Sequence, residues 1–183
     1  MKKRVLIGIL FITLIILTGC TKKDKTESTL MKVLSENSKF IYKENETSLD
    51  DYIKNNPYKI DTKAYVMVDM NDDNKKELVL YLEGIDAEYL VLSLEDDKIY
   101  AYRYSMKDFQ DLRENGVYKK VVKTNSYAYL RSTFNKGKLE EKSLASIDVD
   151  KYTLNNEPST KESFEEYEKN INNTNKVKYT KYN

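Results

Sequence analysis

The amino-acid sequence predicts an α+β fold, a mostly antiparallel β-sheet of about six to eight short strands with short helices at its N- and C-terminal ends. Three observations lead to this prediction. From residue 63 onward, short runs of β-branched, aromatic and leucine residues follow one another, with acidic or glycine-containing turns between them. Helix-capping patterns stand before and after this strand-rich part. The sequence lacks βαβ alternation and a glycine-rich phosphate loop, so a nucleotide-binding fold is not expected.

Two helical segments are expected before the strands. Residues 29–42 mix apolar and polar positions in a way that favours the start of a helix. Ser48 and Asp51 have the spacing of a capping box, and apolar residues then fall on one helical face. Pro57 ends such a helix, so we predict a short helix at 48–55.

The strands are expected to be short and joined by tight turns, which favours antiparallel pairing. Segment 78–82 is apolar at almost every position and so predicts a central strand buried on both faces. Residues 95–98 are typical of a hairpin turn. The predicted strands are 64–68, 78–82, 89–92, 99–104, 117–123, 126–134 and 138–146.

Two more helices are expected later in the chain. Residues 105–113 carry apolar side chains at helical spacing and run into an Asn-Gly pair that would stop a helix. A capping box at 159–162 opens a helix that we expect to reach about residue 170. The tail 171–183 is rich in Asn and Lys and is expected to fray, which leaves 29–170 as a single domain.

The N-terminus carries a secretion pattern. A basic start is followed by an apolar stretch from Val5 to Leu17, which is shorter than the roughly 20 residues that a bilayer span needs. The stretch ends in Leu-Thr-Gly-Cys, which resembles the lipobox of bacterial lipoproteins. The resemblance implies that residues 1–19 are removed and that Cys20 becomes the lipidated first residue. The alternative is a plain secretory signal with an incidental cysteine.

Lipidation at Cys20 predicts a protein anchored on the outer face of the cytoplasmic membrane, in the extracytoplasmic space. Two acyl chains anchor stably where one would be marginal. Residues 20–28 are charged and lack large apolar side chains, so we expect a flexible tether between the lipid and the domain.

Composition removes several classes of function. The chain has no histidine and one cysteine, so histidine-based acid–base catalysis, histidine-ligated zinc and disulfide bracing are excluded. Lys and Arg number 31 against 30 Asp and Glu, with no long basic run in the folded part, so nucleic acid is not an expected partner.

An acidic loop at residues 69–77 has the chemistry of a calcium site. Oxygen-bearing side chains fall at loop positions 1, 3, 5 and 9, with a backbone carbonyl at position 7, as in the first part of an EF-hand loop. The segment resembles Asp-x-Asn-x-Asp-Gly calcium loops, with Asn74 in the glycine position, and weak structural Ca²⁺ binding is expected. The alternative is an ordinary solvated hairpin loop. The candidate ligands are Asp69, Asn71, Asp73, Lys75 and Glu77.

The chain holds 16 tyrosines and no tryptophan. Period-two geometry places alternate tyrosines of 99–104 and of 126–134 on one face of each strand. Such faces are candidate binding surfaces for glycan or peptide; the alternative is that the rings pack in the core, because Tyr is favoured in strands. The candidates are Tyr100, Tyr102, Tyr104, Tyr127 and Tyr129.

Taken together, the features resemble a loose group of uncharacterised lipid-anchored or secreted proteins of Gram-positive bacteria. The resemblance rests on the lipobox and on segments 68–78, 109–118 and 164–167, and it implies a fold but no activity. We expect an envelope module that binds a protein or cell-wall component or supports an envelope assembly. The alternative is a carboxylate-dependent hydrolase of cell-wall glycan, which needs two suitably spaced acids.

Overall fold

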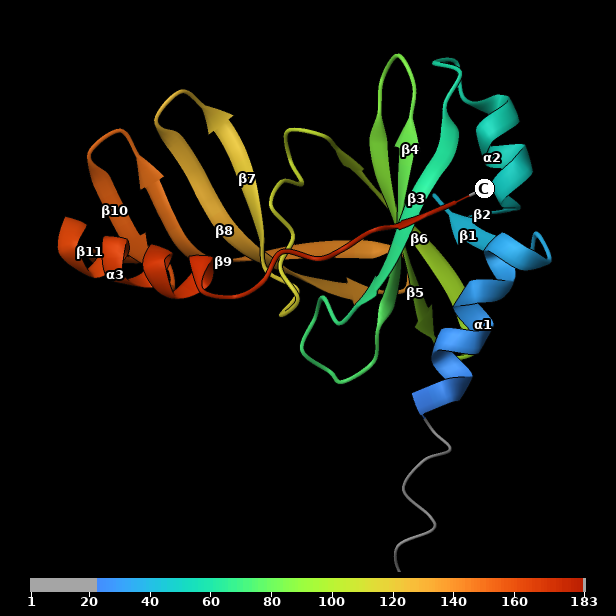
Figure 1. Cartoon of the computed structure of the whole chain (residues 1–183), viewed down its shortest axis with the longest axis horizontal. Coiled ribbons are helices and arrows are strands. Elements are labelled where there is room, and N and C mark those ends of the chain that lie inside the picture. Colours follow the sequence, from blue (N-terminus) through green and yellow to red (C-terminus); the bar gives the residue numbers. More distant parts are fainter. Residues whose placement is uncertain (1–22, 183) are drawn as a thin grey trace, which may run out of the picture.

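The computed structural model describes residues 23–182. These residues form an α+β structure of three helices and twelve strands, mostly antiparallel, which confirms the predicted fold class. The twelve strands exceed the predicted six to eight and lie in two sheets rather than one. Figure 1 shows the two sheets side by side, with α1 and α2 at one end of the molecule and α3 at the other.

The first sheet has seven strands in the order β12-β3-β4-β5-β6-β1-β2. Its neighbours pair antiparallel, except that β1 runs parallel to β6. The strands are β1 (Phe40–Tyr42), β2 (Asn45–Thr47), β3 (Asp61–Val68), β4 (Glu77–Glu83), β5 (Glu88–Glu95), β6 (Lys98–Ser105) and β12 (Thr180–Lys181).

The second sheet has five antiparallel strands in the order β11-β10-β9-β8-β7. They are β7 (Tyr118–Lys123), β8 (Ser126–Asn135), β9 (Lys138–Asp148), β10 (Lys151–Leu154) and β11 (Glu157–Ser159). The helices are α1 (Lys23–Ser35), α2 (Leu49–Asn55) and α3 (Lys161–Asn172). Among the described residues, no helix has both the length and the apolar character needed to cross a bilayer.

The core lies in three clusters that follow this layering. Leu30 and Val33 of α1 pack on one face of the first sheet. The opposite face packs against side chains of the second sheet and of the loop before β7, with Tyr118 fully buried between them. A third cluster joins the second sheet to Phe164 and Ile171 of α3. The first sheet is therefore covered on both faces.

β4 is the central strand that the sequence predicts. Leu78, Leu80 and Leu82 belong to the cluster under α1, whereas Val79 belongs to the cluster toward the second sheet. All four side chains are fully buried. A strand with both faces covered has no need for alternating polar residues, which explains its continuous apolar run.

The predicted cap of α2 is confirmed, whereas the cap of α3 is Thr160, one residue after the Ser159 that the predicted capping box implies. Ser48 Oγ accepts a hydrogen bond from the Asp51 N–H, and Thr160 Oγ1 accepts one from the Ser163 N–H, each at 3.2 Å. These bonds satisfy donors that a helix start otherwise leaves unpaired. Both helices begin directly after their caps.

The predicted tether is wrong for residues 23–28, because α1 begins at Lys23. Leu30 and Val33 anchor this helix on β4 and β5, and each residue added to a formed helix gains a backbone hydrogen bond. An ion pair of 2.8 Å between Glu27 and Lys76 holds the early turns. The helix ends at Ser35, so part of the predicted segment 29–42 is strand β1 instead.

The helix predicted at 105–113 does not form. Its backbone makes turns, and Gln110 exchanges two hydrogen bonds with Lys119, of 2.8 and 2.7 Å. This pairing between distant residues competes with helical bonding. The apolar spacing instead buries Phe109 and Leu112 between the two sheets.

The tail after α3 does not fray as predicted. It crosses from the second sheet back to the first, where Thr180 and Lys181 pair with β3 (Figure 1). The Val177 N–H donates to the Leu112 carbonyl at 3.0 Å on the way. Tyr179 packs near Tyr89, with ring centroids 6.0 Å apart. The domain therefore includes the C-terminal strand.

Candidate functional site

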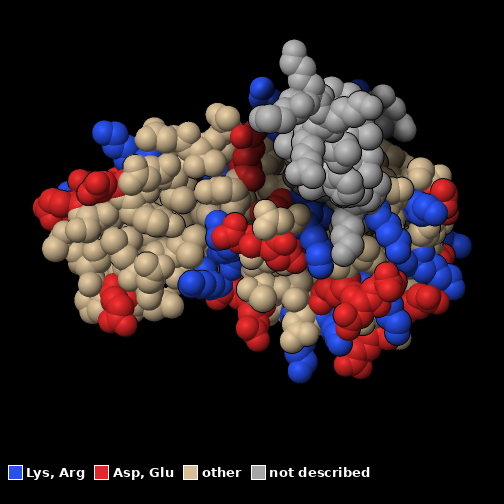
Figure 2. Space-filling model, turned by 90° about the horizontal axis from the view of Figure 1, so that it is seen from below, with Lys and Arg blue, Asp and Glu red and all other residues tan. Residues whose placement is uncertain are grey.

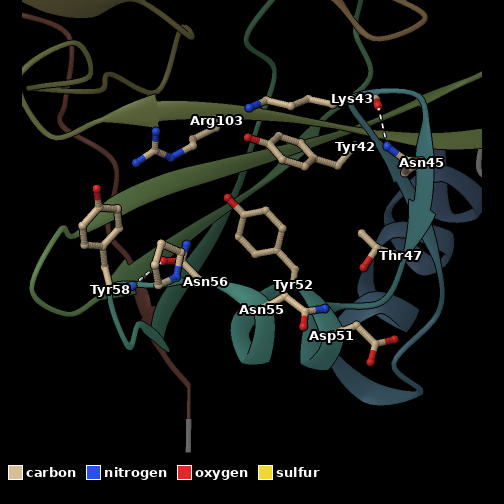
Figure 3. Close-up of a pocket in the computed structure, with 11 residues that line it drawn as sticks. Tyr42, Lys43, Asn45, Thr47, Asp51, Tyr52, Asn55, Asn56, Tyr58 and Arg103 are labelled. Carbon is tan, nitrogen blue, oxygen red and sulfur yellow. Dashed lines mark hydrogen bonds between the residues drawn. The ribbon is translucent and has the colours of Figure 1, made fainter.

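A cavity of about 450 Å³ opens where α2 meets the edge of the first sheet (Figure 3). Its walls come from the β1–β2 hairpin, from α2 and the loop after it, and from β6. We call it the tyrosine pocket. The residues that shape it are Tyr42, Lys43, Tyr52, Asn55, Tyr58 and Arg103.

Three tyrosines form the aromatic walls of the tyrosine pocket. The rings of Tyr42 and Tyr52 meet edge to face, with centroids 5.2 Å apart and planes at 87°. Their hydroxyl groups point to the same side, toward Arg103 (Figure 3). Tyr58 stands at the rim and is 45% exposed. The pocket therefore combines rigid ring surface with hydroxyl groups that reach its interior.

A buried carboxylate holds Arg103 in place. Glu88 is fully buried, and its carboxylate accepts hydrogen bonds from Arg103 Nε and, at 2.6 Å, from the Tyr52 hydroxyl. A second carboxylate, of Asp86, accepts from Arg103 Nη2 at 3.0 Å. The bond to Glu88 raises the pKa of Arg103, and burial together with Glu88 raises the pKa of Tyr52. Both side chains therefore keep their protons at any physiological pH.

The turn between β1 and β2 brings Tyr42 and Lys43 to the pocket. Lys43 and Glu44 both have positive φ, of 48° and 68°, which is the backbone that a two-residue hairpin turn requires. Asn45 Nδ2 donates to the Lys43 carbonyl at 3.0 Å and stabilises this turn. Figure 3 shows the Lys43 side chain extending along the pocket beside Tyr42.

Sequence reasoning missed the tyrosine pocket. Its residues come from three separated segments, and β1 lies beside β6 through parallel pairing that no local sequence pattern predicts. The turn at 43–44 carries Lys-Glu instead of the Asn-Gly that marks such hairpins. The available signal was the density of Tyr and Asn between residues 42 and 58.

The acidic loop forms between β3 and β4, as expected, and its side chains bind the loop's own backbone. Asp69 accepts hydrogen bonds from the N–H groups of Asp72, Asp73 and Asn74, at 2.7, 3.3 and 2.8 Å. Asn74 has a φ of 64°, so it takes the left-handed backbone predicted for it. Asn71 and Asp73 accept from N–H groups two residues ahead.

Glu77 lies apart from the loop tip, at the start of β4. The residue is 2% exposed, and its carboxyl group accepts a hydrogen bond from the Met70 N–H at 2.8 Å and lies 3.4 Å from Ser93 Oγ. The pKa of Glu77 is raised to about 8, mainly by burial; the hydrogen bond from Met70 opposes this shift, and the charges of Asp73 and Asp69 contribute to it. The group is therefore mostly protonated at neutral pH.

The predicted calcium ligands do not all converge. Asn71, Asp73, Lys75 and Glu77 line one polar cavity of about 220 Å³. Asp69 lies outside the lining of this cavity. Within residues 23–182, no group of three or more acidic, histidine or cysteine side chains is placed to hold a metal ion. Calcium binding by this loop stays a prediction.

The tyrosine face of β6 is largely a core face, so Tyr102 and Tyr104 offer no free binding surface. Tyr102 and Tyr104 are buried in the cluster between the sheets, and Tyr100 packs against it half-buried. The Tyr102 hydroxyl donates to Glu95 at 2.6 Å, and the Tyr104 hydroxyl bonds Ser132 at 2.7 Å. The rings of Tyr102 and Tyr104 fill the core between the two sheets, which is the alternative interpretation of these tyrosines.

The tyrosines of β8 also pack in a core, the one between the second sheet and α3. Tyr129 is buried and Tyr127 is half-buried in the third cluster. Both hydroxyls donate to Glu168 of α3, at 2.8 and 2.7 Å. Lys119 Nζ lies 3.4 Å from the centroid of the Tyr127 ring and covers its open side. These two tyrosines hold a helix and offer little free surface.

Cys20, the predicted lipid attachment site, lies outside the described residues. Figure 2 shows one face of the molecule, on which basic and acidic side chains lie intermixed over the half that holds the first sheet. On this face the half with the second sheet carries fewer charges. Comparison with protein-family models, curated proteins and solved structures finds no match to this chain.

Proposed function

We propose that this chain is a lipid-anchored module on the outer face of the cytoplasmic membrane, which binds a protein or cell-wall component through the tyrosine pocket. The observation that carries the proposal is the fully buried Glu88, whose carboxylate fixes both Arg103 and Tyr52 at the pocket wall. A buried ion pair contributes little net stability, so this arrangement is better explained by the orientation it imposes on Arg103.

Composition supports binding over catalysis. The absence of histidine and of a second cysteine leaves the pocket without an imidazole for acid–base catalysis or a thiol nucleophile. Tyr42, Tyr52 and Tyr58 supply ring surface and hydroxyl groups, which are the properties that recognition sites use. The module therefore holds its ligand without changing it.

Photo-crosslinking on intact cells tests the pocket. The amino acid p-benzoylphenylalanine in place of Tyr58 keeps an aromatic ring at the exposed rim, and we expect it to capture one envelope component. The control carries the same amino acid in place of Val122, which is 71% exposed on β7. This strand belongs to the second sheet and lies far from α2 in Figure 1. Equal capture at both positions, or none at position 58, contradicts the proposal.

The anchor is tested separately. Cells grown with radiolabelled palmitate should label the wild-type chain, and the substitution Cys20→Ala should abolish the labelling because the only thiol is lost. Labelling that survives in Cys20→Ala would show that the lipid is attached elsewhere.

The hydrolase alternative has one supporting observation. Glu77 lines the 220 Å³ cavity together with Asp73, and its raised pKa keeps the proton that a general acid must donate. Yet Glu77 is only 2% exposed, so a glycan cannot reach the carboxyl group without rearrangement. We therefore expect the purified full-length chain not to clear a suspension of isolated cell walls. Clearing that is lost in Glu77→Gln would favour the hydrolase.

A further inference from the structure

We propose that the ligand of the tyrosine pocket is an uncharged, hydroxyl-rich molecule, a short segment of glycan. This inference rests on the proposed function, because it names the class of ligand that the same pocket takes.

The aromatic walls form a corner. Because the rings of Tyr42 and Tyr52 stand at 87° to one another, a ligand can lie flat on one ring while it meets the edge of the other. A pyranose ring presents an apolar C–H face and a hydroxyl rim, so it fits such a corner with its face on a tyrosine. The cavity of about 450 Å³ is within the size range of ordinary ligand sites and has room for a short oligosaccharide.

Polar groups around the corner have unused hydrogen-bonding capacity. Within residues 23–182, no hydrogen bond is formed by the hydroxyl groups of Tyr42 and Tyr58 or by the side-chain amide of Asn55. Hydroxyl and amide groups both donate and accept, and sugar hydroxyls do the same. These groups therefore match a neutral polyhydroxylated ligand better than an ion of either sign.

The charge of Arg103 at the pocket is already paired. Arg103 is bound by the two carboxylates of Glu88 and Asp86, so its positive charge is offset. An anionic ligand would approach Asp86 as well as Arg103. Lys43 adds a positive charge at the wall, with its Nζ 5.3 Å from the centroid of the Tyr42 ring, and this disfavours a cation. A neutral ligand meets neither repulsion.

A peptide ligand is less well served. The edge strand that borders the pocket, β2, has only three residues, so it offers few main-chain hydrogen bonds for an added strand. The lining is rich in tyrosine and amide groups, and Pro57 is its one aliphatic side chain. The pocket therefore lacks an aliphatic subpocket that could bind an apolar peptide side chain.

The experiment titrates the full-length chain, purified in detergent micelles, with three soluble probes followed by isothermal calorimetry and by saturation-transfer NMR. Chitotetraose is the uncharged glycan, poly(glycerol phosphate) the anionic polymer and tetra-alanine the neutral peptide. We expect binding of chitotetraose and none of the other two. Tyr58→Ala and Asn55→Ala should each weaken chitotetraose binding about fivefold or more, because each removes a contact at the pocket without touching the core.

Tyr100→Ala is the matched control. Tyr100 lies on the same strand as Arg103 but on the opposite face, half-buried against the other cluster. We expect the control to bind chitotetraose as the wild type does. Binding that both pocket variants leave unchanged, or preferential binding of the anionic polymer or the peptide, would overturn the inference. Capture of a protein from position 58 without chitotetraose binding would also overturn it, while the proposed function would stand.

Discussion

Glu77 is a described residue whose protonation near neutral pH depends on the fold. The folded chain holds a proton on Glu77 up to about pH 8, whereas the unfolded chain loses that proton near the usual pKa of 4.5. Between these values the folded state therefore binds more protons than the unfolded state. The linkage relation then requires the free energy of unfolding to fall as the pH rises through this window, and to level off above it.

We predict that Glu77→Gln removes this slope. In EDTA, the variant and the wild type should be about equally stable near pH 4.5, and the variant should be more stable at pH 8 by on the order of several kcal/mol. The glutamine keeps an oxygen for the Met70 N–H and an amide toward Ser93. Urea unfolding at a series of pH values measures the difference. Glu140→Gln, an exposed glutamate on β9, is the control, and parallel curves for Glu77→Gln and wild type would contradict the prediction.

A close approach of two loops makes Gly116 intolerant of any side chain. A Cβ atom at Gly116 would lie 2.2 Å from the Asp69 carbonyl oxygen and 2.6 Å from Met70 Cα, and the residue has a φ of 77°. We predict that Gly116→Ala lowers the free energy of unfolding by about 3 kcal/mol or more. The backbone at Asp69 and Met70 must shift to make room for the Cβ atom, and the alanine must also adopt a left-handed backbone conformation.

Gly137→Ala separates the two causes of that loss. Gly137 has a similar φ of 87°, but its Cβ would lie 3.7 Å from Tyr100 Cδ1, an ordinary contact. This variant should lose only about 1 kcal/mol, the cost of the left-handed backbone. Chemical denaturation of both proteins gives the comparison. Similar losses in the two variants would mean that the clash of the Gly116→Ala Cβ atom with the acidic loop does not lower the free energy of unfolding.

At the scale of elements, the sequence predicts those features that depend on interactions between neighbouring residues. The cap at Ser48, the start of α3 to within one residue and the apolar run of β4 were predictable, because a cap or a doubly covered strand acts through neighbouring residues. The segment 105–113 was misread because its apolar spacing fits a helix equally well, and only pairing with Lys119 decides against one. The tyrosine pocket depends on β1 lying beside β6, which is a contact between distant segments.

The acidic loop is the element for which a cation remains a prediction. If the loop binds Ca²⁺ with a dissociation constant near 1 mM, then 10 mM Ca²⁺ adds about 1.4 kcal/mol of stability, or roughly 3–5 °C in melting temperature. Because a bound cation favours the ionised form of Glu77, the gain should be larger at pH 8 than at pH 6. Equal melting temperatures in EDTA and in Ca²⁺ would exclude the site, and Mg²⁺ at the same concentration controls for ionic strength.

At the scale of the whole molecule, the tail after α3 connects the two sheets. Arg113 Nη1 and Nη2 donate to the Thr174 carbonyl and to Asn172, at 2.9 and 2.8 Å, which ties the tail to the loop between the sheets. Tyr179 then packs in the cluster that both sheets share. The same cluster holds side chains of β4, β5, β6, β7 and β8, so removing either sheet would expose the core that the two sheets share.

This shared core predicts that the protein unfolds as one unit, and Tyr179→Ala tests it. Removing the ring from the shared cluster should cost about 2–4 kcal/mol. Because the cluster belongs to both sheets, hydrogen–deuterium exchange should accelerate in β4 and β5 of the first sheet and equally in β8 of the second. Val122→Ala, at an exposed position, should change neither exchange nor stability. Faster exchange confined to β12 and β3 would instead mean that the tail stabilises only the strand it pairs with, and that the two sheets unfold independently.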